Sequence, residues 1–205
     1  LPQNASTVGL IDLKILSEEN EKQYSFFDKL NNNEFKLLYL LGSDNLEFKK
    51  DNEFIIYQGS HGDRGAEIAD VILPSPTYTE QGGLFENLEG RVQECKKASY
   101  PIGDALEDWK IFNLIIKKLN KTQDLSNFNL LRKEVLNFIP NFSKLNELPF
   151  YKDSLNKKNE SKFISEEISI KELDYFYTNS ISRASKTMSE CRLINQNSKK
   201  TGTNN

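Results

Sequence analysis

Residues 53–73 decide the fold of this chain, and they read Glu-Phe-Ile-Ile-Tyr-Gln-Gly-Ser-His-Gly-Asp-Arg-Gly-Ala-Glu-Ile-Ala-Asp-Val-Ile-Leu. An apolar run over 53–58 leads into a glycine-rich loop, and a second, shorter apolar run over 69–73 is ended by Pro74. A continuous apolar run bounded by turn residues is typical of a strand that is buried on both faces. We therefore predict two buried strands, with a loop and a short helix between them.

A third apolar run lies upstream of this stretch. Residues 36–41 read Lys-Leu-Leu-Tyr-Leu-Leu and are followed by the turn residues Gly-Ser-Asp-Asn, so they predict another buried strand. Buried strands that are separated by short loops and helices favour an α/β fold. The expected architecture of residues 1–140 is a Rossmann-like layered sheet.

Two helices and a hairpin are expected beyond the sheet. Residues 84–95 predict an irregular loop or a hairpin. Asp104 is a candidate N-cap with Glu107 three residues further on, and a second helix is expected over 127–138, where Pro140 would end it. Four apolar residues that follow Asp104 recur at helical spacing and form one face of the first helix: Trp109, Phe112, Ile116 and Leu119.

The composition changes at about residue 141. Asparagine, lysine and serine dominate residues 141–205, and apolar residues come in isolated clusters. We expect a second region here, a polar extended tail that docks on partner subunits. A short amphipathic helix over 181–194 is predicted by residues spaced three and four apart: Ile181, Ala184, Met188, Cys191 and Ile194.

The composition of the chain argues against several classes of protein. A length of 205 residues is sufficient for a substantial core, and a net charge of −3 provides no electrostatic basis for binding nucleic acid. No apolar run approaches the roughly 20 residues that a membrane helix requires, so no membrane span is expected. The only cysteines, Cys95 and Cys191, are too few for a four-cysteine iron–sulfur site. We expect two reduced thiols.

The loop between Gly59 and Gly65 is the first candidate site. Bare backbone amides ahead of a helix can bind phosphate, but glycines spaced three apart match neither the dinucleotide nor the Walker pattern. We interpret the glycines as allowing a tight strand-to-helix turn. His61 is the only histidine and lies near Asp63 in sequence, yet neither a nucleophile nor a set of metal ligands accompanies it.

Four carboxylates are candidates for acid–base chemistry, although their spacing selects no pair: Asp70, Glu80, Glu86 and Glu89. We favour turn and surface hydrogen bonding for them. Glu89 and Arg91 are expected to form a local ion pair, worth under about 1 kcal/mol if it is exposed.

Serine hydroxyls and one arginine fill residues 180–185. Phosphorylation would need a basic docking context and a nucleophilic serine would need a base, and the sequence around them supplies neither. We interpret this segment as a polar docking segment in which Arg183 anchors an interface.

Three blocks of the chain resemble a known family. The first is 54–73, the second runs from 78 through Glu-Gly-Arg-Val-Gln at 89–93 to 111, and the third is Tyr-Phe-Tyr-Thr-Asn-Ser-Ile-Ser-Arg-Ala-Ser at 175–185. Together they resemble the C-terminal part of the molybdopterin oxidoreductase-like domain in the 75 kDa-type iron–sulfur subunits of respiratory complex I. The first two blocks are also similar to molybdenum-dependent formate dehydrogenases and nitrate reductases, whereas the third resembles the complex I subunits alone.

The resemblance implies a scaffold role in NADH:ubiquinone oxidoreductase. It implies that this chain holds no catalytic, cofactor-binding or metal-binding residues, and that the iron–sulfur clusters lie in a partner chain carrying the N-terminal part of the same subunit. Other complex I subunits are the further partners that it implies. The expected location is the mitochondrial inner membrane complex, on the matrix side. We hypothesise that the subunit is split between two polypeptides.

Two other interpretations stay open. One is a fragment of a molybdopterin-dependent oxidoreductase such as a formate dehydrogenase, which bound molybdenum or pterin would favour. The other is a non-redox interaction module, which stable monomeric folding in isolation would favour. The complex I interpretation instead predicts an unsatisfied sheet edge.

Overall fold

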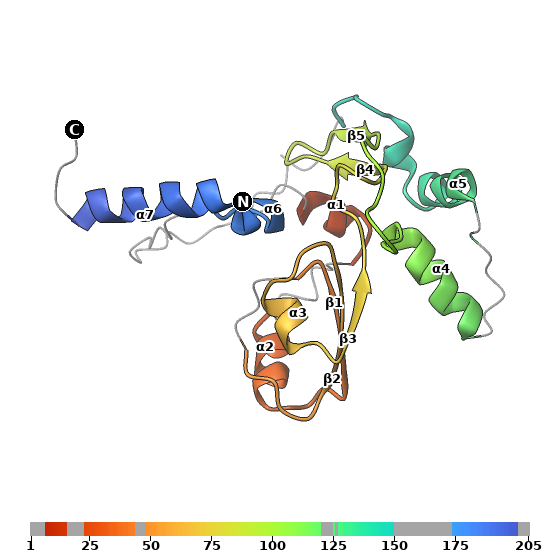
Figure 1. Cartoon of the computed structure of the whole chain (residues 1–205). Coiled ribbons are helices and arrows are strands. Elements are labelled where there is room, and N and C mark those ends of the chain that lie inside the picture. Colours follow the sequence, from red (N-terminus) through yellow and green to blue (C-terminus); the bar gives the residue numbers. More distant parts are fainter. Residues whose placement is uncertain are drawn as a thin grey trace, which may run out of the picture. The chain divides into compact units, whose positions relative to one another are not determined.

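The computed structural model describes residues 7–15, 23–43, 48–119, 125, 127–149 and 174–200. The chain divides into two units, drawn in Figure 1. The first unit comprises Leu1–Ser60 and Arg64–Tyr151, and the second comprises His61–Asp63 and Lys152–Asn205. Within the described residues, no helix combines the length and the apolar character that crossing a bilayer requires.

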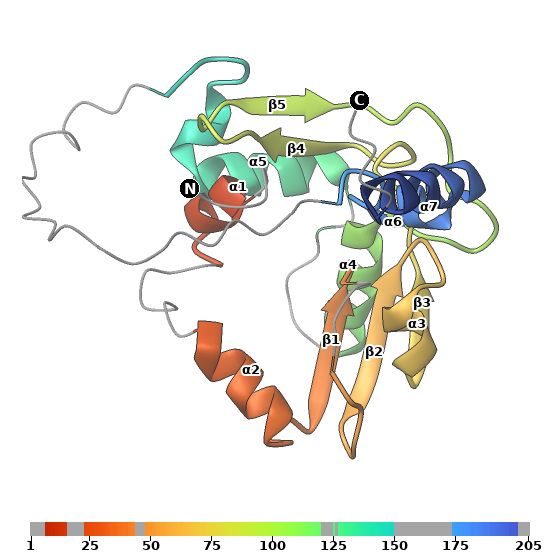
Figure 2. The same cartoon turned by 90° about the vertical axis from the view of Figure 1, so that its left-hand side faces the viewer.

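The first unit contains a parallel sheet made of the three apolar runs. Strands β1 (Leu37–Leu41), β2 (Phe54–Gly59) and β3 (Val71–Pro74) lie in the order β1-β2-β3 and run in the same direction (Figure 2). All three predicted strands are therefore confirmed, and so is the α/β fold class. Parallel pairing requires a crossover between successive strands, and the loop and helix after β2 provide the one that leads to β3.

One face of the sheet carries the main core. Helices α2 (Gln23–Asn31) and α3 (Arg64–Ile68) lie on this side, as Figure 1 shows. The buried cluster is Leu30, Leu38, Leu40, Phe48, Ile55 and Tyr57. Each such side chain contributes about 1.5–3 kcal/mol when it is fully buried, so this cluster is the chief source of stability in the unit.

The other face of the sheet is covered by α4 (Asp108–Lys118). The ring of Tyr39 stacks on that of Phe112 with 5.6 Å between the centroids. The side chain of Gln58, near the end of β2, donates to Asp108 in the first turn of α4. Both contacts tie α4 to the sheet through residues of the central and edge strands.

The start of α4 differs from the prediction. The helix begins at Asp108, so Asp104 does not cap it, and the capping residue Glu107 makes no side-chain bond to the helix backbone. Glu107 instead accepts a 2.7 Å hydrogen bond from Trp109 Nε1, and its carboxylate lies 3.3 Å from Lys97 Nζ. The expected helix was correct, but the residue at its start acts through side chains and not through the free backbone amides.

Glu107 is only 9% exposed, and its environment shows how a buried carboxylate is stabilised. Burial favours the protonated form, but the hydrogen bond from Trp109 and the charges of Lys110 and Lys97 outweigh it and lower the pKa of this carboxyl below its usual value. Glu107 therefore joins the start of α4 to the segment that follows the hairpin.

Of the two alternatives for residues 84–95, an irregular loop or a hairpin, the structure shows a hairpin, in which β4 (Gly83–Glu86) and β5 (Val92–Cys95) pair antiparallel. Its turn depends on Asn87, whose Oδ1 accepts from the backbone amides of Glu89 at 3.0 Å and Arg91 at 2.9 Å. Gly90 takes a φ of 78°, a conformation that glycine adopts without steric cost. The predicted turn residues thus form a tight connection stabilised by an Asn side chain.

A second core lies under the hairpin. It consists of the buried residues Val92, Ile139 and Phe142 with Leu13, Leu84 and others packed around them. Helix α5 (Phe128–Phe138) confirms the predicted helix over 127–138, and Asn127 caps it by accepting from the Asn129 amide at 2.8 Å. The turn η2 (Pro140–Ser143) and helix α1 (Thr7–Asp12) complete this part of the first unit.

Two helices lie in the described part of the second unit. Helix α6 (Ser180–Ala184) ends at Ser185, whose ψ of 120° is extended, and α7 (Lys186–Lys200) follows. The predicted single helix over 181–194 is therefore two helices. Asn179 and Ser182 form a capping box at the start of α6. Of the predicted extended tail over 141–205, residues 150–173 and 201–205 lie outside the described residues.

Replacing Glu107 by alanine is expected to lower the free energy of unfolding by about 1–3 kcal/mol, because the half-buried Trp109 indole loses its acceptor. The exposed Asp104 is the matched control, and Asp104→Ala is expected to change stability by less than about 0.5 kcal/mol. Urea unfolding followed by the fluorescence of Trp109, the only tryptophan, measures both. A loss from Asp104→Ala as large as that from Glu107→Ala would contradict this account.

Candidate functional site

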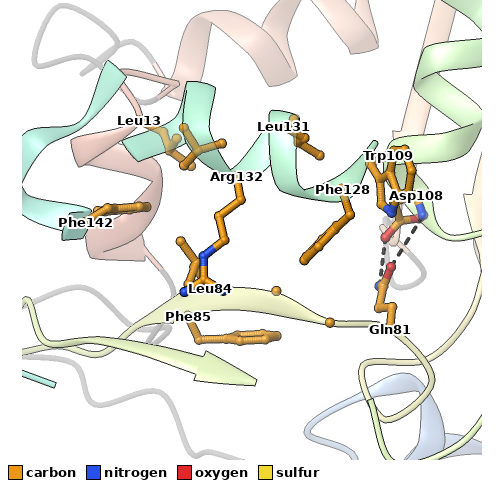
Figure 3. Close-up of a pocket in the computed structure, with 13 residues that line it drawn as sticks. Leu13, Gln81, Leu84, Phe85, Asp108, Trp109, Phe128, Leu131, Arg132 and Phe142 are labelled. Atoms are coloured by element: carbon orange, nitrogen blue, oxygen red, sulfur yellow. Dashed lines mark hydrogen bonds between the residues drawn. The ribbon is translucent and has the colours of Figure 1, made fainter. Parts of the chain in front are cut away.

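A cavity of about 340 Å³ lies in the first unit between the hairpin, α5 and the start of α4. Figure 3 shows its lining side chains. The apolar ones include Leu13, Leu84, Phe128, Leu131, Val135 and Phe142. A concave, largely apolar cavity with a few polar groups is the usual form of a binding site, so it is the first place to look for function.

The polar edge of the cavity is a closed hydrogen-bond network. Asp108 accepts from Gln58 Nε2 at 2.7 Å and from Gln81 Nε2 at 2.9 Å, the latter drawn in Figure 3. Gln58 is fully buried, and its carbonyl oxygen accepts from the hydroxyl of Tyr39. Burial raises the pKa of that hydroxyl, and the charge of Asp108 raises it further. The network is therefore arranged to join the sheet to α4.

The basic group on the cavity wall is also paired. Arg132 extends from α5 toward β4 (Figure 3), and its Nη1 lies 2.5 Å from Oε1 of Glu94 on β5. The carboxylate of Asp108 is hydrogen bonded by two neutral amides, and the charge of Arg132 is compensated by the carboxylate of Glu94. The lining is therefore mainly apolar, and its charged groups are hydrogen bonded within the first unit.

Sequence reasoning singled out neither Gln58 nor Asp108. The available signal was an amide residue at the end of an apolar run, because a buried amide must be hydrogen bonded. Its partner lies 50 positions away in sequence, so no local spacing identifies it.

The glycine loop after β2 is accounted for by packing. A Cβ added at Gly59 would lie 2.1 Å from Tyr57 Oη, and one at Gly65 would lie 2.8 Å from both the Ser43 carbonyl oxygen and the Tyr57 ring. These glycines therefore make room for a tyrosine that is 1% exposed. Because that ring occupies the space beside both glycines, a larger residue at either position would clash with it.

The remaining loop residues belong to the second unit. Asp63 lies 2.5 Å from Nε of Arg183, the arginine of the serine-rich segment. His61 lies in the same short piece of chain. The arginine that sequence reasoning assigned to an interface is thus paired within the chain itself.

Gly65→Ala is expected to destabilise the chain by about 1–3 kcal/mol, because the new methyl group would meet a backbone carbonyl and a buried ring. The matched control is Gly62→Ala in the same loop, where a Cβ would meet nothing within 4 Å. Thermal unfolding of the two variants should separate them clearly. Equal melting temperatures would show that the loop has no packing constraint.

Three of the four candidate carboxylates have structural roles. Asp70 accepts from Lys50 Nζ at 2.6 Å and from the Ile55 amide at 2.7 Å, and these bonds lower the pKa of its carboxyl. Glu80 accepts from the Thr77 amide at 3.1 Å. Glu89 is exposed in the hairpin turn. As favoured from the sequence, these three serve turns and surface contacts.

The ion pair expected between Glu89 and Arg91 is wrong. No such pair forms among the residues that the structure describes, because Asn87 holds the turn and its Nδ2 lies 3.5 Å from Glu89 Oε2. Arg91 directs its Nε into a buried position without a hydrogen-bond partner. The hairpin turn separates two residues that are close in sequence.

Glu86 is different from the other carboxylates. It lies at the end of β4, is 7% exposed, and neither of its side-chain oxygens has a hydrogen bond of normal geometry. Helix α1 packs over it: a Cβ added at Gly9 of this helix would lie 3.5 Å from Glu86 Oε2. Burial raises the pKa of Glu86 to about 7, and the neighbouring carboxyl of Asp12, by its charge and by sharing a proton, adds to the shift.

The sign of this shift predicts a pH dependence. Because the folded state holds the Glu86 proton more tightly than the unfolded state, stability should fall as the pH rises from about 4.5 to about 7. The decrease is on the order of 2–3 kcal/mol. The glutamine in the Glu86→Gln variant cannot ionise, so this substitution is expected to remove most of the decrease in stability. Glu89→Gln in the same hairpin should leave the decrease unchanged. Urea unfolding at a series of pH values measures the free energy of unfolding as a function of pH. The same dependence on pH in Glu86→Gln as in the original chain would overturn this prediction.

Metal ligands are not gathered in the part of the protein that the structure describes. Among those residues, no three His, Cys, Asp or Glu side chains come together in a way that would hold an ion. Cys95 and Cys191 are both free thiols and half-buried.

Two protein families match the chain, in successive stretches. The model of the molybdopterin oxidoreductase family matches residues 1–118, which is more than half of the chain. A model of the C-terminal region of the G-type NADH-ubiquinone oxidoreductase subunits matches residues 145–191. The first match takes in the parallel sheet and the hairpin, and the second takes in α6.

Individual relatives agree with the family matches. The chain is 39% identical over 199 residues to the NADH-ubiquinone oxidoreductase 75 kDa subunit of Reclinomonas americana, covering 95% of this chain and 28% of that protein. It is 37% identical to the G-type subunit of the NADH-quinone oxidoreductase of Rickettsia felis, covering 93% of this chain and 27% of the relative.

A third relative is the mitochondrial 78 kDa subunit of NADH-ubiquinone oxidoreductase from Candida albicans, at 36% identity over 93% of this chain and 27% of the relative. The chain thus spans little more than a quarter of the length of the relatives that it matches. Its sheet, its hairpin and the family match over residues 1–118 lead to one conclusion: this chain belongs to the molybdopterin oxidoreductase family.

Proposed function

We propose that this chain is a structural part of the large iron–sulfur subunit in the peripheral arm of respiratory complex I. It would support electron transfer from NADH to ubiquinone without binding a cluster itself. The observation that carries this proposal is the succession of the two family matches, because the second, over residues 145–191, describes the C-terminal region of an NADH-ubiquinone oxidoreductase subunit.

The chemistry of the chain supports a scaffold role. A cluster held by cysteines needs four of them, and the sequence has two. The buried polar groups beside the cavity bind one another, and the glycine loop is filled by Tyr57. We infer that iron–sulfur clusters are bound by the part of the subunit that the relatives carry beyond this match.

The proposal extends to partners and location. The chain would associate with the polypeptide that carries the cluster-binding part of the subunit, and with other complex I subunits. We propose that these two parts are separate polypeptides, and that they lie on the matrix side of the mitochondrial inner membrane.

A fragment of a molybdopterin-dependent enzyme is the second candidate, favoured by the name of the family that matches residues 1–118. Molybdenum that co-purifies with the chain in stoichiometric amount would decide for this candidate.

Native gel electrophoresis of mitochondrial membranes tests the proposal. We expect the chain to migrate in the band with NADH dehydrogenase activity, together with a cysteine-rich polypeptide that mass spectrometry identifies as the cluster-binding part. The control is a denaturing gel of the same band, which separates two polypeptides from one continuous chain.

Each other outcome has a definite meaning. A single continuous polypeptide in that band would disprove the split subunit but keep the complex I role. Migration as a small species without NADH dehydrogenase activity would reject the complex I role and favour an independent interaction module.

A further inference from the structure

The second face of the parallel sheet is incompletely covered. Parallel sheets occur almost only where helices cover both faces, because the crossovers place them there. In the first unit, α2 and α3 lie on one face of the sheet, whereas α4 lies on the other (Figure 1). Its contacts with that face are the stack of Phe112 on Tyr39 and the hydrogen bond from Gln58 to Asp108, and both involve the middle or later residues of the strands.

Leu37 and Phe54 lie at the opposite end of this face from the contact between Gln58 and Asp108. Val71 lies at the β3 edge of the same face, level with the middle of β2. Leu37, Phe54 and Val71 are 55%, 46% and 39% exposed, and each is the first residue of its strand. Leu37 pairs directly with Phe54, and Val71 pairs with Ile56, two residues beyond Phe54 on the same side. Because side chains alternate along a strand, all three lie on the face that α4 covers. We call these three residues the strand-start patch. Leu41, at the end of β1 on this face, is also 51% exposed.

The dimensions of the strand-start patch match a single helix. Three neighbouring strands spaced about 4.8 Å apart span about 10 Å, and a helix with its side chains is about 10 Å wide. All three side chains are apolar, and each would gain from burial by a partner with a matching apolar face. Helices α2 and α3 lie on the opposite face of this sheet, so a helix is also what the layered architecture favours on this face.

We propose that the strand-start patch is covered by an amphipathic helix from the part of the subunit that lies outside this chain's match to its relatives. The inference rests on the proposed function. The relative from Reclinomonas americana is a single chain of which this one covers 28%, so most of that protein is available to supply the helix. A second copy of this chain is disfavoured, because a stable interface buries about 800 Å² per partner and three side chains supply only part of that.

Hydroxyl-radical footprinting of the purified chain and of the intact complex tests the inference. In the free chain, Leu37, Phe54 and Val71 should be labelled, whereas the buried Ile55 should not. In the complex, labelling of the strand-start patch should fall to the level of Ile55. Labelling that stays as high in the complex as in the free chain would overturn the inference, and so would protection already present in the free chain.

A photo-crosslinking amino acid at position 54 identifies the occupant. In the complex, it should react with an apolar helix in the cluster-binding part of the subunit. Crosslinks to another subunit, to a second copy, or within this chain would each overturn the inference. If the chain is present in the active complex while the patch stays open, the inference fails and the proposed function stands. If the chain is absent from the complex, both fail.

A matched pair of variants measures the contribution of the patch. Phe54→Ser should weaken retention of the chain in the complex by about tenfold or more, because a large aromatic side chain at an interface is replaced by a small polar one. Leu130→Ser on α5 is the control, since Leu130 is 50% exposed and lies outside the patch. Circular dichroism of both free variants establishes that they fold. Equal retention of the two variants would contradict a specific role for the strand-start patch.

Discussion

The side chain of Gln58 is fully buried in the central strand, so its amide must find partners inside the protein. Leaving such a group unpaired costs about 1–3 kcal/mol. Tyr39 on β1 and Asp108 on α4 meet this requirement, and Asp108 in turn accepts from Gln81. The position of α4 over the sheet, and the cavity whose edge this network forms, both follow from that requirement.

The charged side chains around the cavity and at the start of α4 are held by partners within the first unit. Asp108, Arg132 and Glu107 each make a hydrogen bond or an ion pair there. Glu86 is the exception, because burial beside Asp12 disfavours its ionised form. Its effect falls on the docking of α1, which makes it a determinant of stability in a chain that we propose to act by completing a larger subunit.

Several local features could be predicted, and several could not. The apolar runs predicted the three strands, and the Pro140 signal correctly predicted the end of α5. The capping pattern at Asp104 was wrong because the carboxylate of Glu107 is drawn to Trp109 and two lysines. The helix expected over 181–194 is broken at Ser185, although its apolar spacing continues through the break. The spacing of apolar residues indicates which of them would share a face of a helix, but it does not indicate whether the backbone stays helical between them.

The sequence by itself determined the strands of the parallel sheet, the principal helices of the first unit and the family, because these depend on periodicity, on turn residues and on contiguous motifs. Only the tertiary structure decided that Gly59 and Gly65 enclose Tyr57, that Gln58 binds Asp108, and that Glu86 is buried beneath α1. It also decided which apolar residues remain uncovered on the sheet. The physical reason is that burial and hydrogen-bond pairing are set by residues brought together from distant positions, whereas periodicity and turns are properties of neighbouring ones.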